Sequence, residues 1–522
     1  MSFFERGKQD EIELKLSFQP EDLPRLRNLP IFKSLSSGRP RTRTLISVYY
    51  DSPDLALRKK LIALRVRKTA GRYVQGVKTG AAHIGGIIVR KELESPVPTK
   101  DPVLAAIEDE SLRRIIFRAG KLEPIFRTEF KRTSRQLTLE GGCEVTLDID
   151  IGEIVAAAAR EPICEMELEL KSGPPHRLFD LAMTVLPSVP LRLSTISKAK
   201  RGYALLSGER PGWRKDVPID LSADATVEKA LAHTVQHCLD HMLANEACVL
   251  ESEDPEGIHQ MRVALRRLRS ALTLYRHVLP AEQYGSVVGE AKWLIGQLAP
   301  VRDWDVFGME ILEPVAAQFP GDKAFRILLN GLGKETTRQR RLARKAIRSE
   351  RYSKFLLSIG QWLAQRSWRD QPLTETSVTL LAPVGKLASA RLAKQHKKIL
   401  KRGRGIAEMS PAERHQLRID VKRLRYAIDF FTSLFPPKKA KRFSEKLSDI
   451  QDYLGYLNDI AVAESLLQRL CDLCQDSDAP QCRRAAGIVI GWHTRAMTQS
   501  ESKLVADVSG FMKLKPFWSK RG

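Results

Sequence analysis

The first 206 residues alternate between polar and apolar positions with a period of two, which is the pattern of β-strands. Gly, Pro, Ser and Asp residues typical of turns separate eight such stretches, at 11–18, 44–51, 62–68, 73–78, 87–94, 127–139, 143–155 and 163–171. Two further segments, 21–28 and 175–186, are predicted to be helices. The pattern therefore predicts a β-rich N-terminal domain.

Beyond Asp224 the apolar residues recur every three or four positions and strand signals become rare, which predicts helices. The segment 208–222, between the two patterns, is rich in Pro and Gly and is predicted to be a linker. A second break, at 366–376, divides the helical region. The sequence thus predicts a first domain at 1–207, a linker at 208–222 and an all-α domain at 223–515, with halves at about 223–365 and 377–515.

The helical region contains the same 11-residue pattern twice, 156 positions apart. Residues 259–269 and 415–425 both read H-x-x-R-x-x-x-(R/K)-R-L-R. The same shift carries Leu298 to Leu454 and Asp303 to Asp459. A single shift that holds over roughly fifty residues predicts a duplicated helical unit.

The spacing of this pattern places its basic residues on one face of a helix. Successive positions are three or four residues apart, and an apolar stripe runs beside them. The residues of the two basic stripes are His259, Arg262, Arg266 and Arg269, and His415, Arg418, Lys422 and Arg425. Like charges on one face repel, so the arrangement costs stability unless an anion binds there. A solvated basic helix is the alternative, but two matched copies favour an anion site.

The charge of the whole chain points the same way. A net charge of +24 and a pI near 9.8 predict a polyanionic partner: nucleic acid, an anionic membrane surface or polyphosphate. Only 7% of the residues are aromatic and no known nucleic-acid-binding motif is present, so no nucleic acid is expected. Neither a signal peptide nor a run of about 18 apolar residues is present, so we expect no membrane partner and a cytoplasmic location.

Charged residues also follow the alternation of the N-terminal strands. Residues 11–16 place Glu11, Glu13 and Lys15 on one face and three aliphatic residues on the other. Some strands carry mainly carboxylates on this face, whereas others carry mainly Arg and Lys. The charged face could be exposed to solvent, as is common for antiparallel sheets. If it faces inward, carboxylates for a divalent metal lie beside cations that bind phosphate oxygens.

At this point the segment 8–206 resembles the CYTH domain, also called the triphosphate tunnel metalloenzymes. The motifs that carry the resemblance follow the family's order: Glu11-x-Glu13-x-Lys15; YYDSPDLALRKKLIALRVRK, with Arg65 and Arg67; YVQGVK, ending at Lys78; VRKELESPV, with Arg90; LDIDIGE, with Asp148 and Asp150; CEMELELKSG; and SKAKRGYAL, with Lys198 and Arg201. The resemblance implies an antiparallel barrel of about eight strands whose interior binds triphosphate.

Carried over by position, this resemblance implies two sets of site residues. The candidate metal ligands, for Mg²⁺ or Mn²⁺, are Glu11, Glu13, Asp148 or Asp150, Glu165, Glu167 and Glu169. The candidate triphosphate-binding residues are Lys15, Arg65, Arg67, Lys78, Arg90, Lys198 and Arg201. Glu92 or Glu94 positions one of these cations as an alternative to binding metal. The reaction expected is attack of a metal-polarised water on a terminal phosphoryl group.

The helical region, at about 220–510, resembles the CHAD domain, whose hallmark is the repeated basic stripe. The resemblance implies two four-helix halves and a basic surface that binds inorganic polyphosphate. The eight residues of the two stripes are the candidate polyphosphate-binding residues. One departure from the repeat is that Arg302-Asp303-x-Asp305 becomes Asn458-Asp459-x-Ala461, so the halves are not expected to bind equally.

A CYTH domain followed by a CHAD domain is similar to the bacterial inorganic triphosphatases. We therefore expect a metal-dependent enzyme that hydrolyses tripolyphosphate to pyrophosphate and orthophosphate, located in the cytoplasm on polyphosphate granules. Two alternatives stay open. The barrel is catalytically idle and the chain docks on polyphosphate granules, or the substrate is an organic triphosphate such as thiamine triphosphate.

Overall fold

The computed structural model describes residues 10–69, 71–372 and 374–518. Residues 1–9, which the sequence analysis includes in the first domain, lie outside the described residues. The chain forms two compact units. Among the described residues, the first unit runs to residue 211 and also contains 348–367, and the second contains 212–347 together with the residues from 368 to 518.

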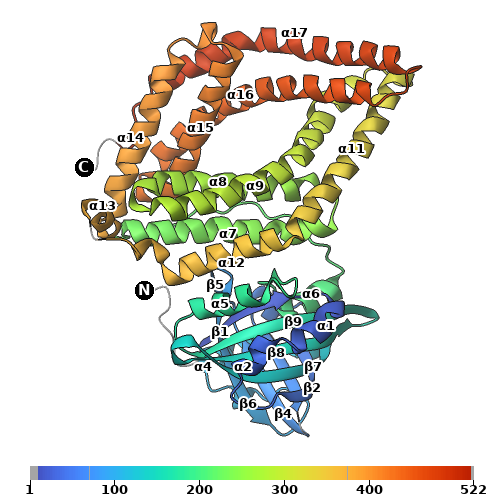
Figure 1. Ribbon diagram of the computed structural model, residues 1–522, viewed down its shortest axis with the longest axis vertical. Helices are drawn as coiled ribbons and strands as arrows, with labels where there is room; N and C mark the ends of the chain where they lie inside the picture. The colour runs from blue at the N-terminus through green and yellow to red at the C-terminus, as the bar shows by residue number, and fades with distance from the viewer. Residues whose placement is uncertain (1–9, 70, 373, 519–522) are drawn as a thin grey trace. The chain divides into compact units, whose positions relative to one another are not determined.

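The first unit is built around a closed barrel of eight antiparallel strands (Figure 1). Around the barrel the strands are β1 (Asp10–Ser17), β9 (Ala159–Ser172), β8 (Cys143–Ala156), β7 (Glu123–Leu139), β2 (Arg41–Asp51), β3 (Ala63–Thr69), β4 (Arg72–Lys78) and β6 (Ile87–Val97). Pairing of β6 with β1 closes the ring. Two short strands pair with members of the ring: β5 (Ala82–Ile84) pairs with β6, and β10 (Arg192–Leu193) pairs with β1. The antiparallel eight-strand barrel is confirmed.

Strand register brings the charged positions together on one face. Lys15 on β1 lies opposite Glu167 on β9, and Glu167 lies opposite Asp148 on β8. Residues directly opposite each other in a sheet point to the same side, so these three side chains share a face. The intervening residues of β1, such as Leu14, are buried on the other face. The alternation seen along β1 therefore separates a charged interior from an apolar exterior.

Helices cover the outside of the barrel. They are α1 (Leu23–Arg27), α2 (Pro30–Ser34), α3 (Ala56–Lys59), α4 (Glu110–Arg118), α5 (His176–Val185), α6 (Lys198–Ser207) and α12 (Glu350–Gln365). The predictions at 21–28 and 175–186 correspond to α1 and α5. Helices α4 and α6 were not predicted, although each begins at a residue that caps it: Asp109 accepts a hydrogen bond from Leu112 N, and Ser197 accepts one from Lys200 N.

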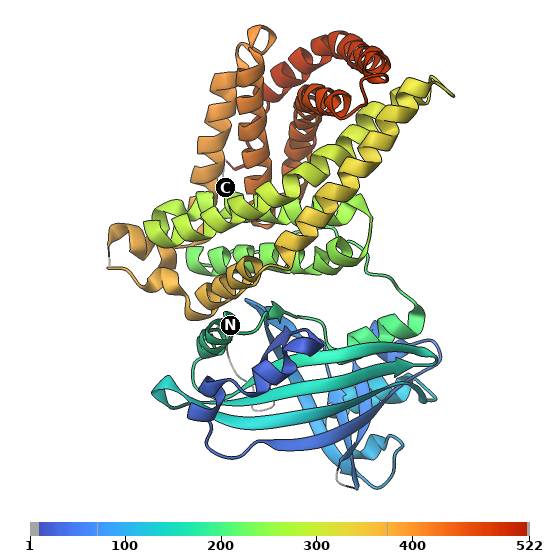
Figure 2. The ribbon, with the colours of Figure 1, turned by 45° about the vertical axis from the view of Figure 1, so that its right-hand side comes forward.

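The second unit is entirely helical, as predicted (Figure 2). Its α-helices are α7 (Val227–Glu251), α8 (Pro255–Tyr275), α9 (Ala281–Val306), α10 (Glu313–Ala316), α11 (Lys323–Ile347), α13 (Glu375–Val378), α14 (Val384–Gly403), α15 (Pro411–Phe431), α16 (Pro437–Asp472) and α17 (Ala479–Met512). Long helices that follow one another pack together, as α7 does with α8 and α16 with α17. None of the helices in the described ranges is long and apolar enough to cross a bilayer.

The repeat in the sequence recurs in the helix bounds. A shift of 156 residues carries α8, at 255–275, onto α15, at 411–431. The same shift carries the first residue of α9 onto the first residue of α16. Both α8 and α15 begin with Pro, preceded by a capping residue, Asp254 or Ser410. The basic stripes therefore occupy equivalent helices of a duplicated arrangement.

The predicted linker is ordered where it belongs to the second unit. The backbone N–H of Arg214 donates to Asn245 Oδ1 at 2.9 Å. Asp216 Oδ1 lies 2.8 Å from His237 Nε2. The N–H of Leu221 donates to Ser433 Oγ at 2.9 Å. Because these bonds replace water at the backbone, residues 212–222 lie on the helices instead of forming a free tether.

Candidate functional site

Three carboxylates converge inside the barrel. One oxygen each of Asp150 on β8 and of Glu165 and Glu167 on β9 lie within 4.8 Å of one another. All three residues are buried, and Asp150 is fully inaccessible to solvent. Carboxylate oxygens at this spacing are the donors that hard divalent cations prefer. Within the described ranges, this is the group of His, Cys, Asp and Glu side chains that could hold a metal ion.

Two buried lysines neutralise this carboxylate trio. Lys198 Nζ lies 2.8 Å from Asp150, 2.5 Å from Glu165 and 2.9 Å from Glu167. Lys15 Nζ lies 3.0 Å from Glu167 and 3.7 Å from Glu165. Burial acts to raise the pKa of Glu165, but Lys198 and Lys15 outweigh it and lower that pKa to about 2. Burial acts to raise the pKa of Glu167 too, but Lys198, Lys15 and Arg132 hold it well below its usual range, so both glutamates are ionised at neutral pH, which is the state that binds metal.

Arg132 on β7 completes the trio's surroundings, and sequence reasoning missed it. Its guanidinium lies 2.6 Å from each of three carboxylates, those of Asp148, Asp150 and Glu167. Ser134, two positions along β7, donates to Asp148 at 2.6 Å. Lys131 and Arg132 are adjacent cations that point to opposite faces, so alternation alone does not reveal which one faces inward. Its place opposite Asp150 depends on strand register, which the sequence does not display.

A second set of cations lines the barrel on β3, β4 and β6. Arg90 lies 3.0 Å from Glu11 and 2.8 Å from Glu13. Lys78 lies 3.0 Å from Glu11 and 2.7 Å from Glu92. Burial acts to raise the pKa of Glu11, yet Lys78 and Arg90 hold it well below its usual range. The structure thus places Glu11 among the cations of β4 and β6.

Arg65 and Arg67 on β3 point into the same interior. Arg65 lies 2.9 Å from Glu92 and 3.1 Å from Glu94, so both glutamates contact cations. Arg67 is less well compensated, because its nearest carboxylate, on Glu94, is 3.8 Å away. Burial and the neighbouring Arg65 lower the pKa of Arg67 to about 10. A partly buried guanidinium with so little compensation favours an anion as its partner.

Tyr49 on β2 is a further interior residue that sequence reasoning missed. It lies opposite Arg65 in the strand register and is 4% exposed. Burial acts to raise the pKa of its phenol, but Arg65 and Arg67 outweigh burial and lower it. The adjacent Tyr50 points to the opposite face of the strand, where its hydroxyl donates to Lys100 O. The inward tyrosine is therefore Tyr49.

Four predicted residues of the barrel remain to be described: Glu13, Asp148, Arg201 and Glu169. Burial and the nearby Glu167 raise the pKa of Glu13, and burial raises that of Asp148. Arg201 on α6 lies 2.6 Å from Glu165. Glu169 lies apart from the trio, since it pairs with Lys171 at 2.5 Å, and its side chain is 28% exposed. The barrel thus brings the predicted tunnel residues together on one face. Glu169 shares that face, because it lies opposite Glu13 in the strand register, but it does not join the trio.

The two basic stripes of the helical unit face each other. Helices α8 and α15 pack together. Arg266 on α8 acts electrostatically on both Arg418 and Lys422 on α15, and Arg262 acts on the same two residues. We call Arg262, Arg266, Arg418 and Lys422 the basic cluster. Burial, Arg418 and Arg266 together lower the pKa of Lys422 to about 7.

The basic cluster has few carboxylates to balance it. Asp303, on α9, lies 3.9 Å from Arg262, and Asp459, on α16, acts on Arg418 and Lys422. Arg262 also donates to the carbonyl oxygen of Leu298 at 3.2 Å. Four cations that repel one another across two helices store unfavourable electrostatic energy, which a bound polyanion would relieve.

The outer members of the stripes show the asymmetry expected from the repeat. His259 lies near Arg302, and burial together with that guanidinium lowers its pKa to about 4. In the second half Asn458 replaces Arg302, and its Oδ1 lies 3.1 Å from His415 Nδ1. Arg269 and Arg425 have other neighbours, Arg423 and Asp429 respectively. The structure therefore brings four of the eight predicted residues into one cluster and leaves the other four at its margins.

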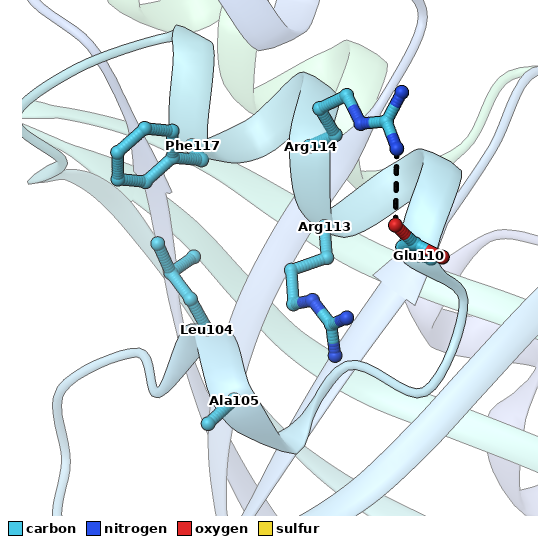
Figure 3. Close-up of a pocket in the computed structure, with 6 residues that line it drawn as sticks. All are labelled: Leu104, Ala105, Glu110, Arg113, Arg114 and Phe117. Carbon is cyan, nitrogen blue, oxygen red and sulfur yellow. Dashed lines mark hydrogen bonds and ion pairs between the residues drawn. The ribbon is translucent and has the colours of Figure 1, made fainter.

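A separate pocket of about 430 Å³ lies on the outside of the barrel unit, at α4 (Figure 3). Its lining residues are Leu104, Ala105, Glu110, Arg113, Arg114 and Phe117. Arg114 pairs with Glu110 at 3.0 Å, and the Phe117 ring is largely exposed. None of the charged residues of the barrel interior lines it, so the pocket is distinct from the candidate site.

Comparison with known families assigns both units. The CYTH domain family matches residues 9–203, and the CHAD domain family matches residues 233–468. The chain therefore carries a CYTH domain fused to a CHAD domain. The barrel unit described above carries the CYTH domain, and the helices with the basic cluster belong to the CHAD domain.

Individual relatives refine this assignment. The CYTH part is 33% identical, over 203 residues, to an inorganic triphosphatase of Haemophilus influenzae. That match covers 37% of this chain and 54% of the relative, so the chain spans about half the length of that protein. An uncharacterised protein of Mycobacterium tuberculosis is 26% identical over 451 residues, 82% of each chain. The crystal structure of the CHAD domain of the plant Ricinus communis matches 58% of this chain and 98% of its own, with 29% identity and a TM-score of 0.50.

Proposed function

We propose that the CYTH domain is an inorganic triphosphatase, which hydrolyses tripolyphosphate to pyrophosphate and orthophosphate with Mg²⁺ or Mn²⁺. The observation that carries the proposal is the buried trio of Asp150, Glu165 and Glu167, surrounded by cations in a closed barrel. The similarity of this part of the chain to an inorganic triphosphatase supports the same conclusion.

The donor set of the trio suits a divalent metal. All three residues offer carboxylate oxygens, which hard cations such as Mg²⁺ and Mn²⁺ prefer. In the structure these oxygens contact the cations of Lys15, Arg132 and Lys198. A bound triphosphate would attract the same cations. When bound, the metal would supply Lewis-acid polarisation of a phosphoryl oxygen and of the attacking water.

The protein's own cations perform the binding. Arg65, Arg67, Lys78 and Arg90 line one side of the interior and can hold non-bridging phosphate oxygens. Lys198 and Arg132 lie beside the metal ligands, where the negative charge increases during phosphoryl transfer. Because these groups are fixed by ion pairs before substrate arrives, stabilising that charge requires little reorganisation.

The proposed activity is tested by measuring orthophosphate release from tripolyphosphate by the full chain. We expect release that requires Mg²⁺ or Mn²⁺ and is abolished by a chelator. Thiamine triphosphate and ATP serve as competing substrates, and we expect a lower kcat/KM for both. Higher kcat/KM with thiamine triphosphate would reassign the substrate, and binding of tripolyphosphate without any release would contradict catalysis.

We also propose that the CHAD domain binds inorganic polyphosphate through the basic cluster, which would place the protein on polyphosphate granules in the cytoplasm. Four cations concentrated on α8 and α15 suit a linear polyanion whose charges are closely spaced. Only 7% of the residues are aromatic and could stack on bases, so nucleic acid is not the expected ligand. Excess long-chain polyphosphate is expected to displace any DNA or RNA from the protein.

Polyphosphate binding is expected to weaken as pH rises from 6 to 8.5. The pKa of Lys422 is about 7 in the free protein, so Lys422 loses its charge over this interval. A bound polyanion favours the charged form, so binding above pH 7 takes up close to one proton. Calorimetry in buffers of different ionisation enthalpy measures that proton uptake, and Lys422→Arg is expected to abolish it. Equal uptake by Lys422→Arg would assign the proton to another group.

A further inference from the structure

Helix α12 belongs to one domain by sequence and to the other by structure. Residues 350–365 lie inside the segment that the CHAD family matches, yet they fold with the barrel unit. Helix α11 of the helical unit ends at Ile347, and only two residues separate it from the start of α12 at Glu350. Most of α12 is buried, including Phe355, Leu356 and Ile359. The helix is therefore an integral part of the barrel unit.

Within the barrel unit α12 packs on α5 and also contacts β5 and β10. Gln361 Nε2 donates to Asp180 Oδ1 on α5 at 2.5 Å. Phe179 of α5 is fully buried, and its ring lies directly against Gly360. In Figure 1, α12 lies next to α5 and to strand β5. The helix is thus fixed by a polar bond as well as by apolar packing.

The closest approach joins Gly360 to Gly85, in the turn between β5 and β6. A Cβ atom added to Gly85 would lie 2.6 Å from both Cα and O of Gly360. A Cβ added to Gly360 would overlap the carbonyl oxygen of Gly85 and the ring of Phe179. Gly85 also has a φ of +63°, which disfavours other residues. Both glycines are therefore required for the backbone of α12 to touch this turn.

The turn leads directly to the tunnel cations. Strand β6 begins at Ile87, and Arg90 is its fourth residue. Gly86 packs tightly on Leu193 of β10, since a Cβ there would lie 2.5 Å from the Leu193 side chain. Strand β10 ends five residues before Lys198, the first residue of α6. The contact with α12 thus restrains the two elements that deliver Arg90 and Lys198.

We infer that α12 positions the triphosphate site: Gly360 holds the β5–β6 turn and, through it, sets Arg90 and Lys198 in the tunnel. The part of this inference that is measured by KM rests on the proposed triphosphatase activity. Neither Gly360 nor α12 contacts the substrate in this role, so each acts through the two cations. The CHAD segment thereby supplies the CYTH domain with a helix that the tunnel requires.

The test is Gly360→Ala in the full chain, compared with Gly289→Ala. Gly289 lies on α9, where a Cβ meets no atom within 4 Å, so the control has the same chemical change without the clash. We expect Gly360→Ala to weaken tripolyphosphate binding at least fivefold by calorimetry and to raise KM in parallel, without changing polyphosphate binding. Gly289→Ala is expected to match wild type in tripolyphosphate affinity, in KM and in polyphosphate binding.

Unchanged tripolyphosphate affinity and KM in folded Gly360→Ala would overturn the inference. If that variant does not fold, Gln361→Ala, which removes only the bond to Asp180, takes its place and is judged by the same affinity. Calorimetry also separates this inference from the proposed function. If wild type binds tripolyphosphate but releases no phosphate, the triphosphatase proposal fails, while the affinity of the α12 variants still decides the role of the helix.

Discussion

Glu167→Gln is expected to lower turnover of tripolyphosphate by about 10²–10³-fold, the range seen when one preorganised charge is removed from an active site. Glu167 is the residue that joins the site together, because it contacts Lys15, Arg132 and Lys198. The amide keeps the size of the side chain but is a poor ligand for a hard cation. We therefore also expect the Mg²⁺ concentration needed for half-maximal activity to rise.

Glu169→Gln is the matched control for this prediction. It makes the same change two residues further along β9, on a side chain that pairs with Lys171 and lies outside the trio. We expect a loss within about fivefold, because Glu169 is not one of the three converging carboxylates and its partly exposed ion pair contributes little. Steady-state phosphate release at several Mg²⁺ concentrations measures both variants. Equal losses in the two would show that the trio is not the metal site.

Arg266→Ala combined with Arg418→Ala is expected to weaken polyphosphate binding at least about a hundredfold. A hydrogen bond to a charged group contributes about 1.5–3 kcal/mol, and the variant removes one such donor from each helix of the basic cluster. The substitution also relieves the repulsion between the two guanidinium groups, so the fold is expected to be retained or stabilised. Titration with long-chain polyphosphate at fixed ionic strength measures the change.

The control removes two charges elsewhere in the same domain. Arg341→Ala with Lys345→Ala alters exposed residues of α11 and changes the net charge by the same amount. We expect a loss below about threefold, because well-separated exposed charges are screened by salt. A comparable loss in this control would mean that polyphosphate recognises the overall charge of the chain, which would refute a discrete site on α8 and α15.

Those features of the fold that depend on local periodicity were predictable from the sequence. Alternation identified the eight barrel strands, and it placed Glu13 and Lys15 on one face. The spacing of the basic stripe located α8 and α15. In each case neighbouring residues carry the signal, because helix and strand geometry repeats over a few positions.

Features that depend on long-range packing were not predictable. Arg132 meets Glu167 only because β7, β8 and β9 pair in one register. The basic stripes converge because α8 packs on α15, which the spacing within each helix does not determine. Helix α12 has an ordinary amphipathic sequence, and nothing in that pattern reveals that it folds with residues more than 150 positions earlier.

The path of the chain limits how the two domains can be separated by recombination. The chain passes between the two units near residues 211, 347 and 367, so the barrel unit is not one continuous stretch of the sequence. A genetic exchange that cut the coding sequence between the two families would leave α5 without α12 and would uncover the ring of Phe179. We therefore expect a CYTH segment of this chain that ends before residue 348 to be less stable than the same segment with α12 restored.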